Sequence, residues 1–198
     1  MLKKQNELIK QLTDKQIVQN LYFTQFLLIV ISFIIGIFLF RDVRDFLHLF
    51  HIRDLRFIYF GTGTALLVII VDFFIFKLAP KDLVDDGGIN EKLFEKRSIP
   101  HIIFLTALIA VSEEILFRGV IQSHFGIWIA SLIFAVLHFR YLSRWLLFFM
   151  VISISFLLGV VYEMTENLYS TILAHFLIDL VFAIQIRVQY VRGVINNE

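Results

Sequence analysis

Three pairs of residues in this chain could do chemistry, because each has its members four positions apart inside an apolar stretch. Residues at that spacing lie on one face of a helix. Charged side chains at membrane depth cost several kcal/mol and usually mark a functional site. The pairs are Glu114 with Arg118, Phe134 with His138, and His175 with Asp179.

The acidic pair Glu113 and Glu114 could activate water. Glu114 can pair with Arg118 along one helix face, so that each keeps the other charged. Glu113 is then the carboxylate without a partner in its own helix, which suits a general base. His138 could hold or share the proton of that water.

His175 and Asp179 leave two kinds of chemistry open. His175 could stabilise an oxyanion, or it could join His138 and Glu113 in a zinc site with an open position for water. No spacing here matches a short zinc motif, and a glutamate and histidine pair activates water without an ion. We therefore favour a mechanism that requires no cofactor, with zinc as the alternative.

The composition predicts an integral membrane protein. Hydrophobic residues make up 59% of the 198 residues and charged residues only 18%, whereas soluble domains carry roughly 25% charged residues. The absence of cysteine excludes disulfides and thiolate chemistry. No basic patch interleaved with aromatic residues indicates a nucleic-acid partner. The partners that we expect are the lipid bilayer and a peptide or membrane-protein substrate.

Hydropathy predicts an all-α, polytopic bundle of about six transmembrane helices in one domain, residues 1–198. A polar segment (1–20) precedes two accessory spans and an interfacial loop (21–99), and a catalytic core (100–188) follows. A short amphipathic helix is expected at 90–96, and Pro100 opens the third span. The predicted spans are 21–40, 57–77, 100–123, 125–139, 144–162 and 168–188.

The distribution of Lys and Arg favours cytoplasmic N- and C-termini, because cytoplasmic loops carry the excess of these residues. The Ile, Phe and Lys content suggests the plasma membrane of a bacterium. Asp72, five residues before Lys77, is expected to be a charge that is paired near the membrane edge.

The three motifs together resemble the CPBP (Abi) intramembrane proteases, relatives of the type II CAAX prenyl endopeptidases, over residues 100–186. The resemblance implies that Glu113 with His138 activates the attacking water and that Glu114 with Arg118 supports the site. It also implies that His175 and the residue four positions later stabilise the oxyanion. The matching segments are Glu113-Glu114-Ile-Leu-Phe-Arg118, Phe134-Ala-Val-Leu-His138 and His175-Phe-Leu-Ile-Asp179.

The chain departs from the prenyl endopeptidases at Asp179, where they carry Asn. An ionised carboxylate can only accept hydrogen bonds, so Asp179 either is protonated, orients His175 or binds a metal. Phe134 is either a packing residue or part of the substrate site. The alternative to a protease is a non-enzymatic protein of this fold, such as a bacteriocin-immunity protein or a peptide-binding scaffold.

Overall fold

The computed structural model describes residues 12–84, 86–138, 141–142 and 144–195, and the described part is helical with no strands. This confirms the predicted all-α membrane bundle. The helices are α2 (Asp14–Leu39), α3 (Val43–Leu47), α4 (Arg56–Leu78), α5 (Lys81–Val84), α6 (Ile89–Phe94), α7 (Ile99–Glu114), η1 (Ile115–Gln122), α8 (Ser123–Leu137), α9 (Trp145–Thr165) and α10 (Leu168–Ile195).

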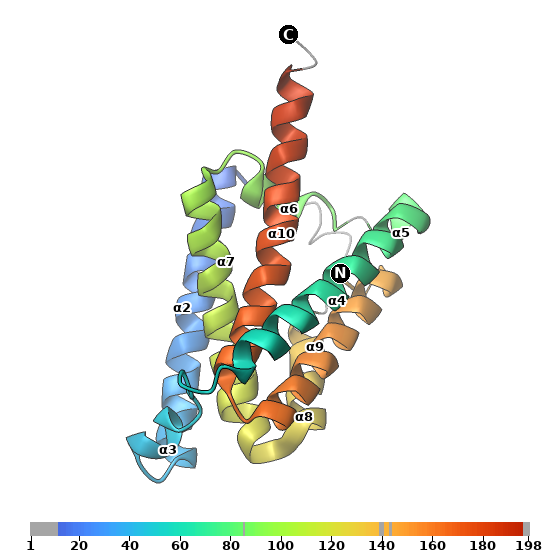
Figure 1. Ribbon diagram of the computed structural model, residues 1–198. Helices are drawn as coiled ribbons and strands as arrows, with labels where there is room; N and C mark the ends of the chain where they lie inside the picture. The colour runs from blue at the N-terminus through green and yellow to red at the C-terminus, as the bar shows by residue number, and fades with distance from the viewer. Residues whose placement is uncertain (1–11, 85, 139–140, 143, 196–198) are drawn as a thin grey trace.

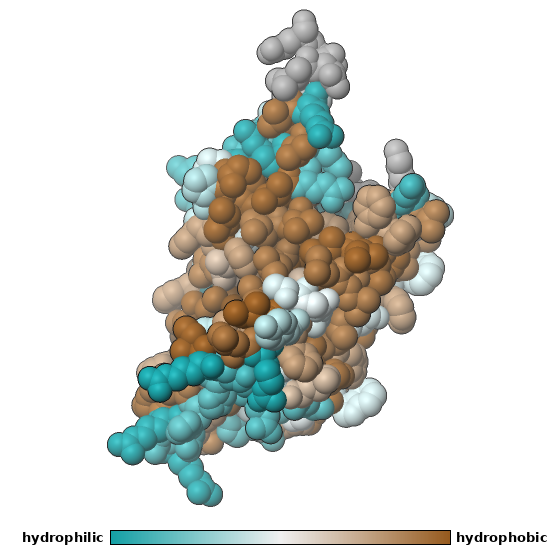
Figure 2. All heavy atoms as spheres, viewed as in Figure 1, coloured by the Kyte–Doolittle hydropathy of each residue, from teal (hydrophilic) through white to brown (hydrophobic). Residues whose placement is uncertain are grey.

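The long helices run up and down through one bundle, with the start of α2 and the end of α10 on the same side (Figure 1). Hydrogen bonds hold this end together. Arg97 donates to the carbonyl of Asp14, and Arg187 donates to that of Glu95. Figure 2 shows a hydrophobic band over the middle of the molecule, with hydrophilic residues at both ends, as a membrane-spanning bundle requires.

Within the described residues, five stretches are long and apolar enough to cross a membrane. They replace six predicted spans, because the third and fourth form one continuous helical stretch, Ile99–Leu137. This stretch is nevertheless bent back on itself. Phe117 and Phe134 would lie about 25 Å apart in a straight helix, yet their ring centroids are 4.8 Å apart.

Gly126 makes the reversal possible. Its φ of 81° and ψ of 169° are not helical, and the positive φ is available to glycine at little cost. After Gly126, α8 continues only to Leu137, a length of about 16 Å. The returning helix therefore covers roughly half of a 30 Å bilayer core.

Helix boundaries differ from the prediction at both ends of the described chain. The helix predicted to start at residue 21 begins at Asp14, because Thr13 and Gln16 form a reciprocal capping box. The last helix continues to Ile195 rather than 188 and extends beyond the neighbouring helices (Figure 1). The short interfacial helix expected at 90–96 is present as α6.

Helix α4 packs closely against α10 because Gly61 has no side chain at their crossing. A Cβ atom at Gly61 would lie 2.9 Å from the carbonyl oxygen of Ser170 and 3.0 Å from the side chain of Leu173. Small residues at such crossings allow backbones to pack in membranes. This contact sets the start of α10, the helix that carries His175.

Candidate active site

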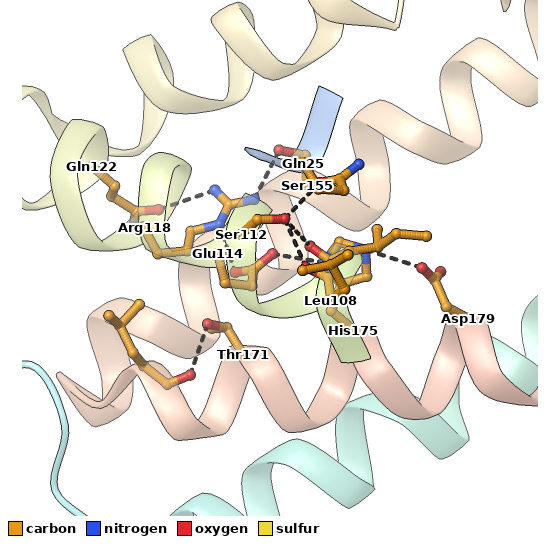
Figure 3. A network of polar contacts seen from close by, with 12 residues as sticks. Gln25, Leu108, Ser112, Glu114, Arg118, Gln122, Ser155, Thr171, His175 and Asp179 are labelled. Atoms are coloured by element: carbon orange, nitrogen blue, oxygen red, sulfur yellow. Dashed lines mark hydrogen bonds and ion pairs between the residues drawn. The ribbon is translucent and has the colours of Figure 1, made fainter. Parts of the chain in front are cut away.

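A π-helix directly follows the two glutamates. Segment η1 has eight residues, of which all but the first are buried, and π-helical turns are frequent at functional sites. The segment places Arg118 and Gln122 four and eight positions after Glu114, so that the three side chains form a line of contacts through the bundle (Figure 3).

Glu114 is the centre of this network and has no solvent exposure. Its Oε2 accepts from Nε of Arg118 at 3.3 Å, which confirms the predicted pairing. Its Oε1 lies 2.9 Å from Nδ1 of His175, on α10. Both carboxylate oxygens are therefore engaged by positively charged or proton-donating groups.

His175 lies between two carboxylates (Figure 3). Nδ1 faces Glu114, and Nε2 lies 3.5 Å from Oδ2 of Asp179. If both carboxylates are ionised, they can only accept, and an imidazole that donates to both is the charged imidazolium. Positive and negative groups then alternate from Arg118 through Glu114 and His175 to Asp179, which is the arrangement that makes buried charges tolerable.

Two further partners of Arg118 are not part of the predicted motif. Nη1 donates to Oε1 of Gln122 at 3.1 Å, and Nη2 donates to Oγ of Ser155 at 2.9 Å. Gln122 stands four positions after Arg118, so its spacing could have indicated it. Ser155 lies 37 residues away on α9, and no sequence pattern connects the two.

Gln25 is a second residue that sequence reasoning missed. It is 3% exposed on α2, a helix whose surface otherwise faces mostly outward. Its side-chain oxygen accepts a hydrogen bond from Ser112, directly before the glutamate pair. A buried amide among apolar residues of a membrane helix was the available signal, and the contact ties α2 to α7 at the depth of the site.

Glu113 and His138 are the two residues predicted to activate water. Glu113 is half-buried, directly before Glu114 in α7. His138 ends α8, with Nδ1 2.9 Å from the carbonyl oxygen of Phe134. The joint cavity that we expect for Glu113, His138 and His175 stays a prediction.

Phe134 positions the ring of His138. Its own ring is buried, stacks on His138 with centroids 4.3 Å apart, and meets Phe117 edge to face. These contacts explain the Phe134 position by packing. Its expected place in a substrate site stays a prediction.

The proposed zinc ligands do not fit an ion in this arrangement. Among the described residues, no three His, Asp or Glu side chains are grouped as metal ligands. In addition, both ring nitrogens of His175 already face carboxylates. A site formed by Glu113, His138 and His175 would require His175 to release one of these partners.

The position of Asp72 differs from the prediction. It was predicted to be paired near the membrane edge, but it is 4% exposed inside α4. Within the described part of the chain it has no hydrogen bond or ion pair. Its neighbours on the same helix face are small or apolar.

A cavity of about 610 Å³ lies between the loop before α4 and the end of α9. Hydrogen bonds from Arg56 lower the pKa of Asp54 in its wall, which keeps that carboxyl charged. A smaller apolar cavity, of about 240 Å³, lies between α4, α7 and α10. Neither is lined by Glu113, His138 or His175.

Comparison with known proteins gives two matches. Residues 95–181 match the family described as Type II CAAX prenyl endopeptidase Rce1-like. A Bacillus subtilis (strain 168) protein named "Uncharacterized protein YpbD" is 60% identical over 169 residues, which cover 85% of this chain and 89% of that protein. No solved structure matches. The matched segment contains all three motifs.

Proposed function

This chain belongs to the type II CAAX prenyl endopeptidase Rce1-like family, and we propose that it is an intramembrane endopeptidase. The observation that supports this proposal best is the buried network of Glu114, Arg118 and His175. An ionic network of this kind within an apolar bundle is expensive, and such groups usually serve a substrate or proton pathway.

The two adjacent glutamates have different roles in this proposal. Both oxygens of Glu114 are engaged by Arg118 and His175, so Glu114 holds His175 in place. Glu113, half-buried beside it, is the general base. His138, whose Nδ1 faces its own helix, presents Nε2 to share the proton of the attacking water.

Hydrolysis then follows from these roles. Glu113 takes a proton from water as the water oxygen bonds to the scissile carbonyl carbon. Nε2 of His175 turns from Oδ2 of Asp179, 3.5 Å away, to donate to the oxyanion that forms. The carbon–nitrogen bond breaks as the proton passes to the leaving amine, and the products are a carboxylate and an amine. Every step uses side chains of this protein, and the mechanism requires no metal.

The proposed substrate is a peptide precursor or a membrane protein whose cleaved bond enters the bundle at membrane depth. A prenylated C-terminal peptide is the substrate class that the family name carries, and it is one possible outcome of the test below. A non-enzymatic peptide-binding protein is the second candidate, since Asp179 cannot donate to an oxyanion as an amide would.

The test is a proteomic comparison of cells that express the wild-type protein or Glu113→Gln. We expect uncleaved precursors to accumulate with Glu113→Gln, and the new termini of the matching products in wild-type cells would name the cleavage site. Glu95→Gln, a substitution of the same chemistry outside the network, is the control and should leave cleavage intact. Equal peptide profiles for all three proteins, with equal expression, would favour the binding protein.

A further inference from the structure

The guanidinium of Arg118 is held by three acceptors from three positions, of which the family motif contains only Glu114. We propose that Gln122 and Ser155 are positioning residues, an inference that rests on the proposed function. They hold Arg118, and through it the carboxylate of Glu114, against His175. None of the residues in this chain of contacts is more than 9% exposed, so water does not substitute for a lost partner.

The cost of leaving Arg118 without these acceptors explains why they are needed. Within the motif, Glu114 accepts from Nε of Arg118, but no described motif residue accepts from Nη1 and Nη2. These donors would then be unsatisfied in an apolar interior, which is costly. Gln122 and Ser155 accept from these two nitrogens at 3.1 and 2.9 Å. The plane of the guanidinium is thereby fixed on three sides, and so is the direction of Nε toward Glu114.

The amide of Gln122 has a fixed orientation. Its oxygen faces Arg118, and its nitrogen donates to the carbonyl oxygen of Gly159 at 2.8 Å and lies 3.4 Å from Oε1 of Glu163. A carboxylate at this position would keep the acceptor for Arg118 but would face two other oxygens. Only a group with one acceptor and one donor satisfies both sides.

Gly159 gives Gln122 access to the backbone of α9. A Cβ atom there would lie 2.6 Å from Cγ1 of Ile127 and 3.0 Å from Oε1 of Gln122. Any larger residue would push α9 away from η1 and α8. The close packing of these helices therefore allows Gln122 to hold Arg118. The position of α9 is coupled to that of His175 through the side chains of Ser155, Gln122, Arg118 and Glu114.

The variants that test this inference are Ser155→Ala and Gln122→Met, with Ser131→Ala as the matched control. Ser131 is also a fully buried serine on a membrane helix, and its hydroxyl has no partner among the described residues. Each full-length protein is labelled with ¹⁵N-histidine and reconstituted in lipid nanodiscs. The signals of His175 are assigned by their loss in His175→Gln. Thermal unfolding is followed in parallel.

We expect the wild-type protein and Ser131→Ala to show the same hydrogen-bonded Nδ1 proton of His175. In Ser155→Ala and Gln122→Met this signal should shift upfield or broaden, although the proteins still unfold cooperatively. A hydrogen bond to a charged group is strong enough for a roughly ten-fold effect, so cleavage of any precursor that accumulates with Glu113→Gln should fall about ten-fold. Ser131→Ala should cleave normally.

An unchanged Nδ1 signal in both folded variants would overturn the positioning role, whatever the cleavage rates are. A shifted signal in a protein for which Glu113→Gln accumulates no precursor would support the positioning role and reject the protease. If Gln122→Met fails to fold, Ser155→Ala decides, because it removes a single hydroxyl. Restoration of the signal by Ser155→Thr would further support the hydroxyl as the responsible group.

Discussion

At the scale of single residues, neighbouring glutamates have opposite surroundings. Glu114 is fully buried between Arg118 and His175, and Glu113 is half-buried. We predict that Glu114→Gln destabilises the protein by about 3–5 kcal/mol, because it leaves Arg118 buried without its counter-charge. Glu113→Gln should unfold near the wild-type temperature. Thermal unfolding in detergent checks both, and equal stability of the two variants would contradict this division of roles.

Asp179 offers a second test at this scale. We predict that Asp179→Asn retains more cleavage of an accumulated precursor than Asp179→Ala, because an amide can still hold Nε2 of His175 or donate to the oxyanion. Steady-state cleavage rates of the purified variants would measure this. If Ala preserved activity and Asn removed it, the oxyanion role of this pair would be wrong. Loss with both variants and with a chelator would instead indicate a metal ligand.

The third prediction concerns metal. We expect purified active protein to contain less than stoichiometric zinc and to resist 1,10-phenanthroline as well as it resists a non-chelating isomer. The reason is that both nitrogens of His175 are already directed at carboxylates. Zinc bound one to one and lost in His138→Ala, together with inhibition by the chelator alone, would move Glu113 from base to ligand.

The sequence allowed part of this site to be predicted. Glu114 and Arg118 pair as their spacing indicates, and the contact of His175 with Asp179 follows the same rule. The contact of His175 with Glu114 joins residues 61 positions apart, and spacing rules do not reach that far. Neutral partners such as Ser155 were missed because buried serines in membrane helices usually bond to their own backbone.

At the scale of elements, hydropathy located the membrane helices but not their irregularities. The predicted boundary between the third and fourth spans lies within two residues of Gly126, where the chain reverses. The π-helix could not be predicted, since it depends on how η1 packs between α2, α8 and α9. The extended start of α2 depends on Thr13, a polar residue that hydropathy places outside the span.

The prediction at the scale of elements concerns Gly126. Gly126→Ala should destabilise the protein by about 1–3 kcal/mol, because a φ of 81° with a ψ of 169° is a backbone conformation that residues with a Cβ atom rarely adopt. Gly63→Ala is the control, since a Cβ there meets nothing within 4 Å in a regular helix, and it should be neutral or slightly stabilising. Chemical denaturation of both variants measures the difference. Equal effects would mean that the reversal does not depend on glycine.

At the scale of the whole molecule, both ends of the described chain lie on one side of the bundle (Figure 1). We predict that single cysteines at Lys96 and Arg192 react from the same side of the membrane, and cysteines at Arg44 and Arg53 from the other. The natural chain has no cysteine, so each label reports one position. An impermeant maleimide applied to intact cells distinguishes the sides.

The orientation of these sides stays a prediction from charge. With the terminal side cytoplasmic, the maleimide should label Arg44→Cys in intact cells and Lys96→Cys only after lysis. The reverse pattern would leave the fold unchanged and invert the protein in the membrane. Labelling of positions 44 and 96 from one side would contradict the single crossing that α4 makes between them.

The ion pair of Glu114 and Arg118 lies within one helical segment, and this arrangement bears on the order of events during synthesis. The two charges emerge from the ribosome almost together and can enter lipid as a neutral unit. The second oxygen of Glu114 meets His175 only after a further 61 residues are made. Until α10 docks, the nascent protein carries an incompletely paired carboxylate within the membrane. Release of this chain from insertion factors should therefore wait for its last helix.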